Sequence, residues 1–195
     1  MSRAQEPGGR WFGRTTVEAV TGELIDQRVE AIVYLANTRG MMEAGSASSI
    51  RLVGGKDVER EAMLLAPHRL GSIFITGSGR LRESNGIELI FHVVLANMLG
   101  ESPRRDLVSR GIDDLLTAAE QRRIRAIAIP VIGAATEASE EERQIAIEAM
   151  VEAIVSWLRR RSARIERILL VARFPDDQFL LDRAIEAARR KIWVE

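Results

Sequence analysis

The chain has 195 residues, of which 46% are hydrophobic, and this length and composition are typical of one globular domain. Lys plus Arg and Asp plus Glu both total 28, so the formal net charge is zero and nucleic acid is not expected as a partner. The chain contains no Cys, which excludes disulfides, thiolate metal sites and a cysteine nucleophile.

The sequence also gives expectations about membranes and location. No apolar run approaches the ~20 residues that a membrane-spanning helix needs. The N-terminus lacks the apolar segment of a signal peptide. We therefore expect a cytoplasmic protein that does not contact a membrane.

Strand and helix patterns alternate along the chain. Residues 1–14 are Gly/Pro-rich and polar, which predicts an N-terminal tail, and residues 15–195 are expected to form a single domain. Strands are predicted near residues 15–20, 29–36, 72–77, 88–95, 125–131 and 166–172. Helices are predicted near residues 46–54, 57–65, 104–123, 138–161 and 176–191. This alternation predicts a three-layer α/β/α sandwich with a mixed, mostly parallel sheet of about six strands.

A lone polar residue follows the most apolar of these strands. Residues 29–36 read as a strand buried on both faces, and Asn37 stands at its carboxyl end. Ligands of open α/β sheets bind outside the carboxyl ends of strands, so Asn37 is placed for recognition. Gly45 and Ser46 then lead into a helix whose free N–H groups suit a phosphate. The alternative is structural, because Asn stabilises turns and Ser caps helices.

Six short motifs occur in the order found in a known family. They are Gly22-Glu23-Leu24, residues 29–37, residues 50–55, LGSIFITGSGRL at 70–81, residues 90–93 and AIAIPVIGAA at 126–135. At these motifs the chain resembles the macro domain, an ADP-ribose-binding module, over roughly residues 17–190. The resemblance implies the macro domain fold and an ADP-ribose site.

The resemblance also implies roles for individual residues. Two loops would hold the diphosphate and the distal ribose, an acidic residue would bind the adenine amino group, and an aromatic residue would lie against the adenine. Glu23, followed by Leu24, matches the acidic position, and Phe174 is the candidate for the aromatic one. The residues expected in the two loops are Asn37, Gly45, Ser46, Gly133, Ala134, Ala135 and Thr136.

Both loops depart from the family pattern. Met42, Glu43 and Ala44 stand where the family has a run of Gly, Ala135 replaces a Gly, and Ala47 replaces an acidic residue common in members. A carboxylate held about 4 Å from a diphosphate charge repels it by ~1 to ~4 kcal/mol, depending on solvation. We therefore expect weakened diphosphate binding, with the fold retained.

The resulting expectation is a protein that binds ADP-ribose or a related nucleotide. Hydrolysis of ADP-ribosyl or O-acetyl-ADP-ribose substrates is expected to be weak or absent, with Asn37 as the catalytic candidate. ADP-ribosylated protein is a further possible partner, and no cofactor or metal is expected. Two alternatives stay open, namely a divergent fold that binds a different phosphorylated ligand and a non-catalytic scaffold. His92 is interpreted as a core residue, and His68 as a surface loop residue.

Overall fold

The computed structural model describes residues 9–42, 46–98, 103–133, 138–161 and 163–192. The strands are β1 (Arg10–Phe12), β2 (Thr15–Thr21), β3 (Ala31–Asn37), β4 (Ile73–Gly77), β5 (Leu89–Ala96), β6 (Ala126–Pro130) and β7 (Arg167–Ala172). The helices are α1 (Ser46–Gly54), α2 (Lys56–Leu64), α3 (Leu81–Asn85), α4 (Val108–Gln121), α5 (Glu140–Arg160) and α6 (Pro175–Ile192). Two short 3₁₀ turns, η1 (Leu24–Asp26) and η2 (Arg105–Leu107), complete the elements.

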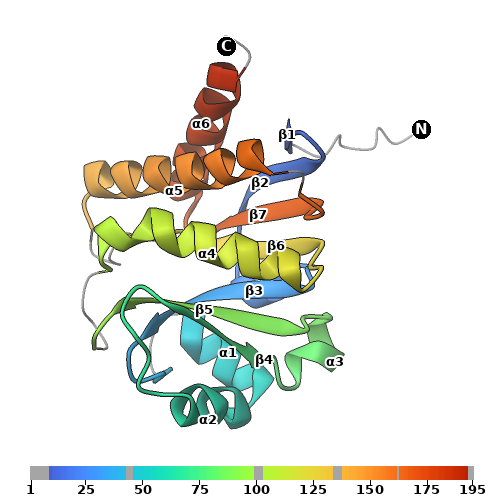
Figure 1. The fold of residues 1–195 in the computed structure, drawn as a ribbon, viewed down its shortest axis with the longest axis vertical. Helices are drawn as coiled ribbons and strands as arrows, with labels where there is room; N and C mark the ends of the chain where they lie inside the picture. The colour runs from blue at the N-terminus through green and yellow to red at the C-terminus, as the bar shows by residue number, and fades with distance from the viewer. Residues whose placement is uncertain (1–8, 43–45, 99–102, 134–137, 162, 193–195) are drawn as a thin grey trace.

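The strands form a mixed sheet in the order β1-β2-β7-β6-β3-β5-β4 (Figure 1). The neighbouring pairs from β2 to β5 are parallel, and the outer strands β1 and β4 pair antiparallel with their neighbours. Helices cover both faces, so the predicted three-layer sandwich with a mostly parallel sheet is confirmed.

Alternate side chains of the central strands supply two separate cores. In β3, Val33 packs into the core under α4, α5 and α6, whereas Ile32 and Tyr34 pack into the core with α1 and α3. Successive strand residues point to opposite faces, and both faces are covered here, so the strand is apolar throughout. In β3 the polar Asn37 accordingly stands at the end of the strand.

One strand and one α-helix were absent from the sequence-based prediction. Strand β1 lies inside the segment 1–14 that was predicted to be a tail, and Phe12 at its end is buried in the core. These three residues form a strand because they pair with β2, and no local sequence pattern predicts that pairing. Helix α3 was missed because it has only five residues, and it ends at Gly86, whose φ is 75°.

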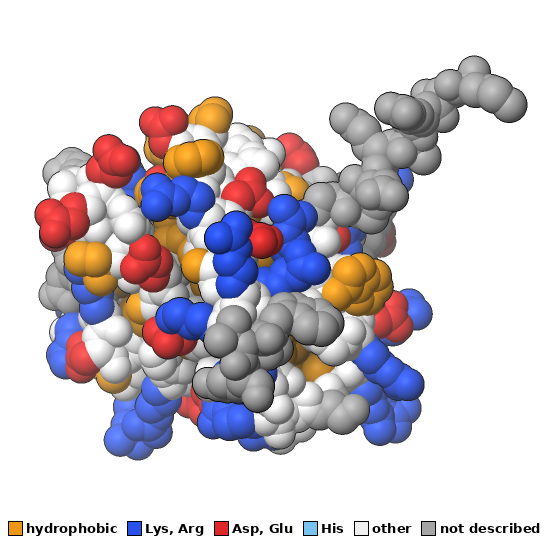
Figure 2. All heavy atoms as spheres, turned by 90° about the horizontal axis from the view of Figure 1, so that it is seen from above, with side chains coloured by type: hydrophobic (Ala, Val, Ile, Leu, Met, Phe, Trp, Pro, Cys, Tyr) orange, Lys and Arg blue, Asp and Glu red, His pale blue; other side chains and the backbone are white. Residues whose placement is uncertain are grey.

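In the part of the chain that the structure describes, no helix combines the length and the apolar character needed to cross a membrane. Charges of both signs are interspersed over the end of the molecule where β1 and α6 lie (Figure 2). Glu186 on α6, for example, pairs with Arg10, Arg189 and Arg190. Such mixing gives this end no single-sign field.

Candidate functional site

The carboxyl ends of β2, β7, β6 and β3 lie at one edge of the sheet, because these four neighbours run parallel. We call it the carboxyl edge; it is the side of Figure 1 on which α4 and α5 begin. Asn37 is the last residue of β3, Gly133 lies three residues after β6, and Phe174 lies two residues after β7. The sheet therefore gathers onto one edge residues that the sequence spreads over more than half of the chain.

Asn37 is buried and its side chain is engaged by its own loop. Its Oδ1 accepts the N–H groups of Arg39 at 2.9 Å and Met41 at 3.3 Å, and its Nδ2 donates to the Met41 carbonyl at 2.9 Å. The turn-stabilising role that the sequence left open is therefore present in the structure. Asn37 orders the backbone at the start of the first loop, which we define as residues 38–45.

Helix α2 holds the same loop from the other side. The Glu59 carboxylate accepts the Met42 N–H at 2.7 Å through Oε1, and Arg51 Nη1 lies 3.3 Å from its Oε2. Met42 is fully buried. Sequence reasoning missed Glu59, and no local signal marks it, since 17 residues separate it from Met42.

Gly40 lets the first loop pass close to α2. Its φ is 70°, and a Cβ at this position would lie 2.6 Å from the Ala62 carbonyl oxygen. No side chain fits at that distance from the backbone, and the left-handed conformation disfavours other residues as well. This contact packs the first loop against the last turn of α2.

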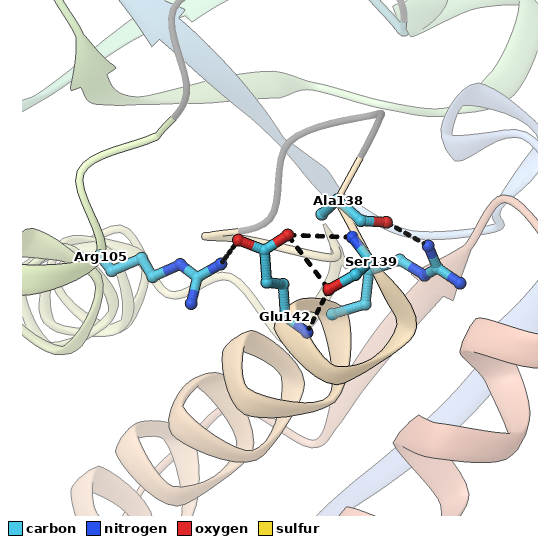
Figure 3. A network of polar contacts seen from close by, with 5 residues as sticks. Arg105, Ala138, Ser139 and Glu142 are labelled. Carbon is cyan, nitrogen blue, oxygen red and sulfur yellow. Dashed lines mark hydrogen bonds and ion pairs between the residues drawn. The ribbon is translucent and has the colours of Figure 1, made fainter.

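The second loop, residues 131–139, is fixed at its far end by the start of α5. The Ser139 Oγ accepts the Glu142 N–H at 3.2 Å, and the Glu142 carboxylate accepts the Ser139 N–H at 3.0 Å (Figure 3). Arg105, from η2, reaches the same carboxylate from the other side, at 3.4 Å. The bonds from Ser139, followed by the charge of Arg105, hold the pKa of Glu142 below its usual range. The Ser-x-x-Glu spacing is a sequence signal for this capping box that our sequence analysis did not use.

A second contact ties the start of α5 to α6. Arg143 donates to the Ala138 carbonyl at 2.5 Å and to Asp177 Oδ1 at 2.9 Å, and Asp177 is buried. The last described residues of the second loop are thus held to both helices. Gly133, at the loop's other described end, has a φ of 93°.

The residues predicted at the adenine end follow two neighbouring strands, β2 and β7. The Gly22 N–H donates to the Ala172 carbonyl at 3.0 Å, so the segments that carry Glu23 and Phe174 leave the sheet side by side. Glu23 is exposed and accepts a long hydrogen bond of 3.5 Å from the Ser49 hydroxyl. Phe174 is 56% exposed, so its side chain is not part of the core.

Three other predictions for the site have separate outcomes. The Leu24 side chain is buried in the core, so only its backbone is available to a ligand. Ser46 is the first residue of α1, as the predicted helix start required. The predicted contacts of Gly45, Ala134, Ala135 and Thr136 fall outside the described residues.

Both histidines lie inside the protein, and the backbone N–H of His68 donates to the Thr38 carbonyl at the start of the first loop, at 2.8 Å. His92 is fully buried in the middle of β5, as expected for a core residue, with Nε2 2.8 Å from the Thr76 hydroxyl and Nδ1 without a hydrogen-bond partner. Burial lowers its pKa to about 3, and the charge of His68 adds to the effect. The prediction that His68 is a surface residue was wrong: its ring stacks on Phe74, which stacks on His92. In the part of the chain that the structure describes, no cluster of His, Asp and Glu could hold a metal ion.

Comparison with known proteins points to one family. The family model described as Macro domain matches residues 33–147, which run from β3 into α5 and include both loops. An uncharacterized protein of Aquifex aeolicus is 28% identical over 80% of this chain and 88% of its own length. The human protein mono-ADP-ribosyltransferase PARP14 is 26% identical over 84% of this chain, which covers only 8% of that protein.

Two solved structures share the fold. The Oceanobacillus iheyensis macrodomain with MES bound has a TM-score of 0.79 and 16% identity, over 94% of this chain and 97% of its own. The Trypanosoma brucei macrodomain in complex with ADP-ribose has a TM-score of 0.73 and 18% identity, over 87% of this chain and 68% of its own.

Proposed function

The chain belongs to the macro domain family, and from that premise we propose that its carboxyl edge binds ADP-ribose or a closely related nucleotide. The observation that carries the proposal is the family match over residues 33–147, which includes both loops of this edge. The structure with the same fold from Trypanosoma brucei is a complex with ADP-ribose.

The proposed site runs along the carboxyl edge. Asn37, Gly45 and Ser46 on one side and Gly133 to Thr136 on the other would hold the diphosphate and the distal ribose. Glu23 and Phe174 would receive the adenine. Two features of the described residues support this end of the site: both side chains are exposed, and the hydrogen bond between Gly22 and Ala172 joins the segments that carry them.

We further propose binding with little or no hydrolysis. Asn37 already uses its oxygen and its amide nitrogen to order the first loop, which favours a positioning role over a chemical one. His92 is buried mid-strand and does not reach the edge. The DNA ADP-ribosyl glycohydrolase of Thermus aquaticus is 28% identical over 59% of this chain. The matched region covers only 32% of the glycohydrolase. That partial coverage does not carry the relative's activity to this chain. An ADP-ribosylated protein as partner and a cytoplasmic location remain part of the proposal.

Calorimetry and thermal shift test the binding. We expect ADP-ribose to bind and to raise Tm, because a ligand at 100 times its Kd stabilises a protein by ~2.7 kcal/mol. ADP, AMP and inorganic phosphate serve as matched ligands. A shift with another nucleotide and none with ADP-ribose supports the divergent-ligand alternative. No shift with any of them, and no heat at millimolar ADP-ribose, contradicts the proposal.

Turnover is tested by incubating the protein with an ADP-ribosylated protein and following the loss of the modification. We expect slow loss that falls further in Asn37→Ala, since positioning would supply most of the acceleration. Rapid turnover that survives Asn37→Ala would show that the assignment of this residue is wrong.

A further inference from the structure

The backbone of the first loop is held from two directions before it reaches α1. Asn37 binds the N–H groups of Arg39 and Met41, the Gly40 N–H donates to the Asn37 carbonyl at 3.1 Å, and Glu59 binds the Met42 N–H. Four successive N–H groups, from residue 39 to residue 42, are thus directed into the protein. None of these four N–H groups is available to a ligand anion.

The contact made by Glu59 differs from those made by Asn37 because it joins two elements. Asn37 organises the loop that directly follows it, whereas Glu59 belongs to α2 and reaches back across α1 to Met42. Its side chain is only 16% exposed, and Arg51 on α1 lies against its second oxygen. One carboxylate therefore connects the first loop, α1 and α2. A hydrogen bond to an ionised group is stronger than one between neutral groups.

We propose that Glu59 is a positioning residue for ligand binding at the carboxyl edge. This inference depends on the proposed function, because it assigns to Glu59 an effect on the affinity for ADP-ribose. Glu59 acts through Met42: with the Met42 N–H fixed, the described part of the first loop keeps one arrangement beside Asn37, the ligand residue proposed at the end of β3. Without the carboxylate, binding would first have to order the loop, and that cost lowers affinity.

A neighbouring residue of α2, Glu61, supplies a matched control. Glu61 also stands on α2, and its carboxylate also accepts a backbone N–H, that of Gly77 at 3.1 Å. Gly77 ends β4, at the border of the sheet rather than in either loop. Glu61→Ala removes the same kind of bond from the same helix and leaves the first loop untouched.

The experiment measures two quantities on Glu59→Ala, Glu59→Gln and Glu61→Ala. Amide hydrogen exchange at Met42, followed by NMR, reports whether the loop is held, and calorimetry reports the Kd for ADP-ribose. In Glu59→Ala we expect Met42 to exchange about tenfold faster and ADP-ribose to bind about tenfold more weakly. Glu59→Gln keeps an acceptor oxygen and should restore both values to within about threefold of wild type. Glu61→Ala should change neither.

Each other result counts against a definite statement. Unchanged exchange at Met42 in Glu59→Ala means that the carboxylate does not hold the loop. Faster exchange with unchanged affinity means that holding the loop does not position the ligand. Equal losses of affinity in Glu61→Ala and Glu59→Ala indicate a general effect on α2 and overturn the assignment. A wild-type protein that binds no ADP-ribose contradicts the proposed function instead, and Met42 exchange in the same samples still decides whether Glu59 holds the loop.

Discussion

The two loops of the carboxyl edge are fixed by different kinds of contact. The first is held by a buried Asn at the end of its own strand and by Glu59, 17 residues from the amide that it binds. The second ends in a capping box between Ser139 and Glu142, three residues apart, with Arg105 alongside. The first anchor is buried and depends on how two helices pack. The capping box of the second loop is exposed and local.

This difference predicts which loop tolerates substitutions with the smaller loss of stability. Loss of a buried anchor should cost more unfolding free energy, because the displaced backbone group loses its partner and finds no water to replace it. Loss of an exposed cap should cost less unfolding free energy, because water replaces the hydrogen bonds that are removed. The predictions below test this contrast from the largest effect to the smallest.

The largest effect is expected for Gly40→Ala. The new Cβ would lie 2.6 Å from the Ala62 carbonyl oxygen at a φ of 70°. Left-handed strain and the overlap with backbone together should cost about 3 kcal/mol of unfolding free energy. Gly86→Ala is the control: its φ is 75° and nothing lies within 4 Å, so strain alone should cost about 1 kcal/mol. Urea unfolding measures both, and equal losses would contradict the close packing of the first loop on α2.

Acid should weaken the side of the molecule next to the first loop before the α5 cap. The folded pKa of His92 is lowered to about 3, whereas its ordinary value is 6.5. Between these pH values the unfolded chain binds the extra proton, so stability falls as the pH falls, by up to ~1.4 kcal/mol per pH unit. The groups that face His92 are Thr76, Phe74 and Tyr34, with His68 beyond Phe74.

The α5 cap should respond only at lower pH. The pKa of Glu142 is lowered from 4.5, so its contribution to stability is present above 4.5 and is lost as the pH falls through the folded value.

Urea unfolding of wild type and His92→Gln between pH 6.5 and 4.5 measures the histidine effect. We expect a shallower pH slope in the variant, and equal slopes would show that His92 does not produce the acid sensitivity.

A smaller effect concerns ligand affinity and compares the loops directly. Glu43→Gly removes a negative charge from the first loop, and Ala135→Gly removes a Cβ from the second; both residues lie outside the described part of the chain. The double change should tighten ADP-ribose binding by about tenfold to thirtyfold, with most of the gain from Glu43→Gly. Calorimetry on the two single variants divides the gain. Unchanged or weaker affinity with a native circular dichroism spectrum would show that the interpretation of these loops is wrong.

The smallest effect is expected for the exposed cap. Ser139→Ala removes one partner of the capping box and should cost about 1 kcal/mol. Ser139→Asp supplies another capping oxygen and should recover most of that loss. Thermal unfolding compares the two variants. A loss from Ser139→Ala as large as that from Gly40→Ala would remove the contrast between the loops.

Several parts of the site were readable in the sequence for a physical reason. An apolar run that ends in Asn37 predicts a buried strand with a polar end, because both faces of a central strand are covered. The prediction of α5 was close, since the acidic residues at its start favour a helix start. Phe174 was selected as a candidate from the family resemblance, by its place just after the last strand, and only the structure showed that its side chain is exposed.

The sequence by itself determined the alternation of strands and helices, the family and the strand ends that form the carboxyl edge. These depend on periodicity and on residues a few positions apart, which the chain displays directly. The tertiary structure alone decided the burial of His68, the pairing of β1 and the contact between Glu59 and Met42. Each depends on the distance at which two separately formed elements pack, and nothing in the residues between them encodes that distance.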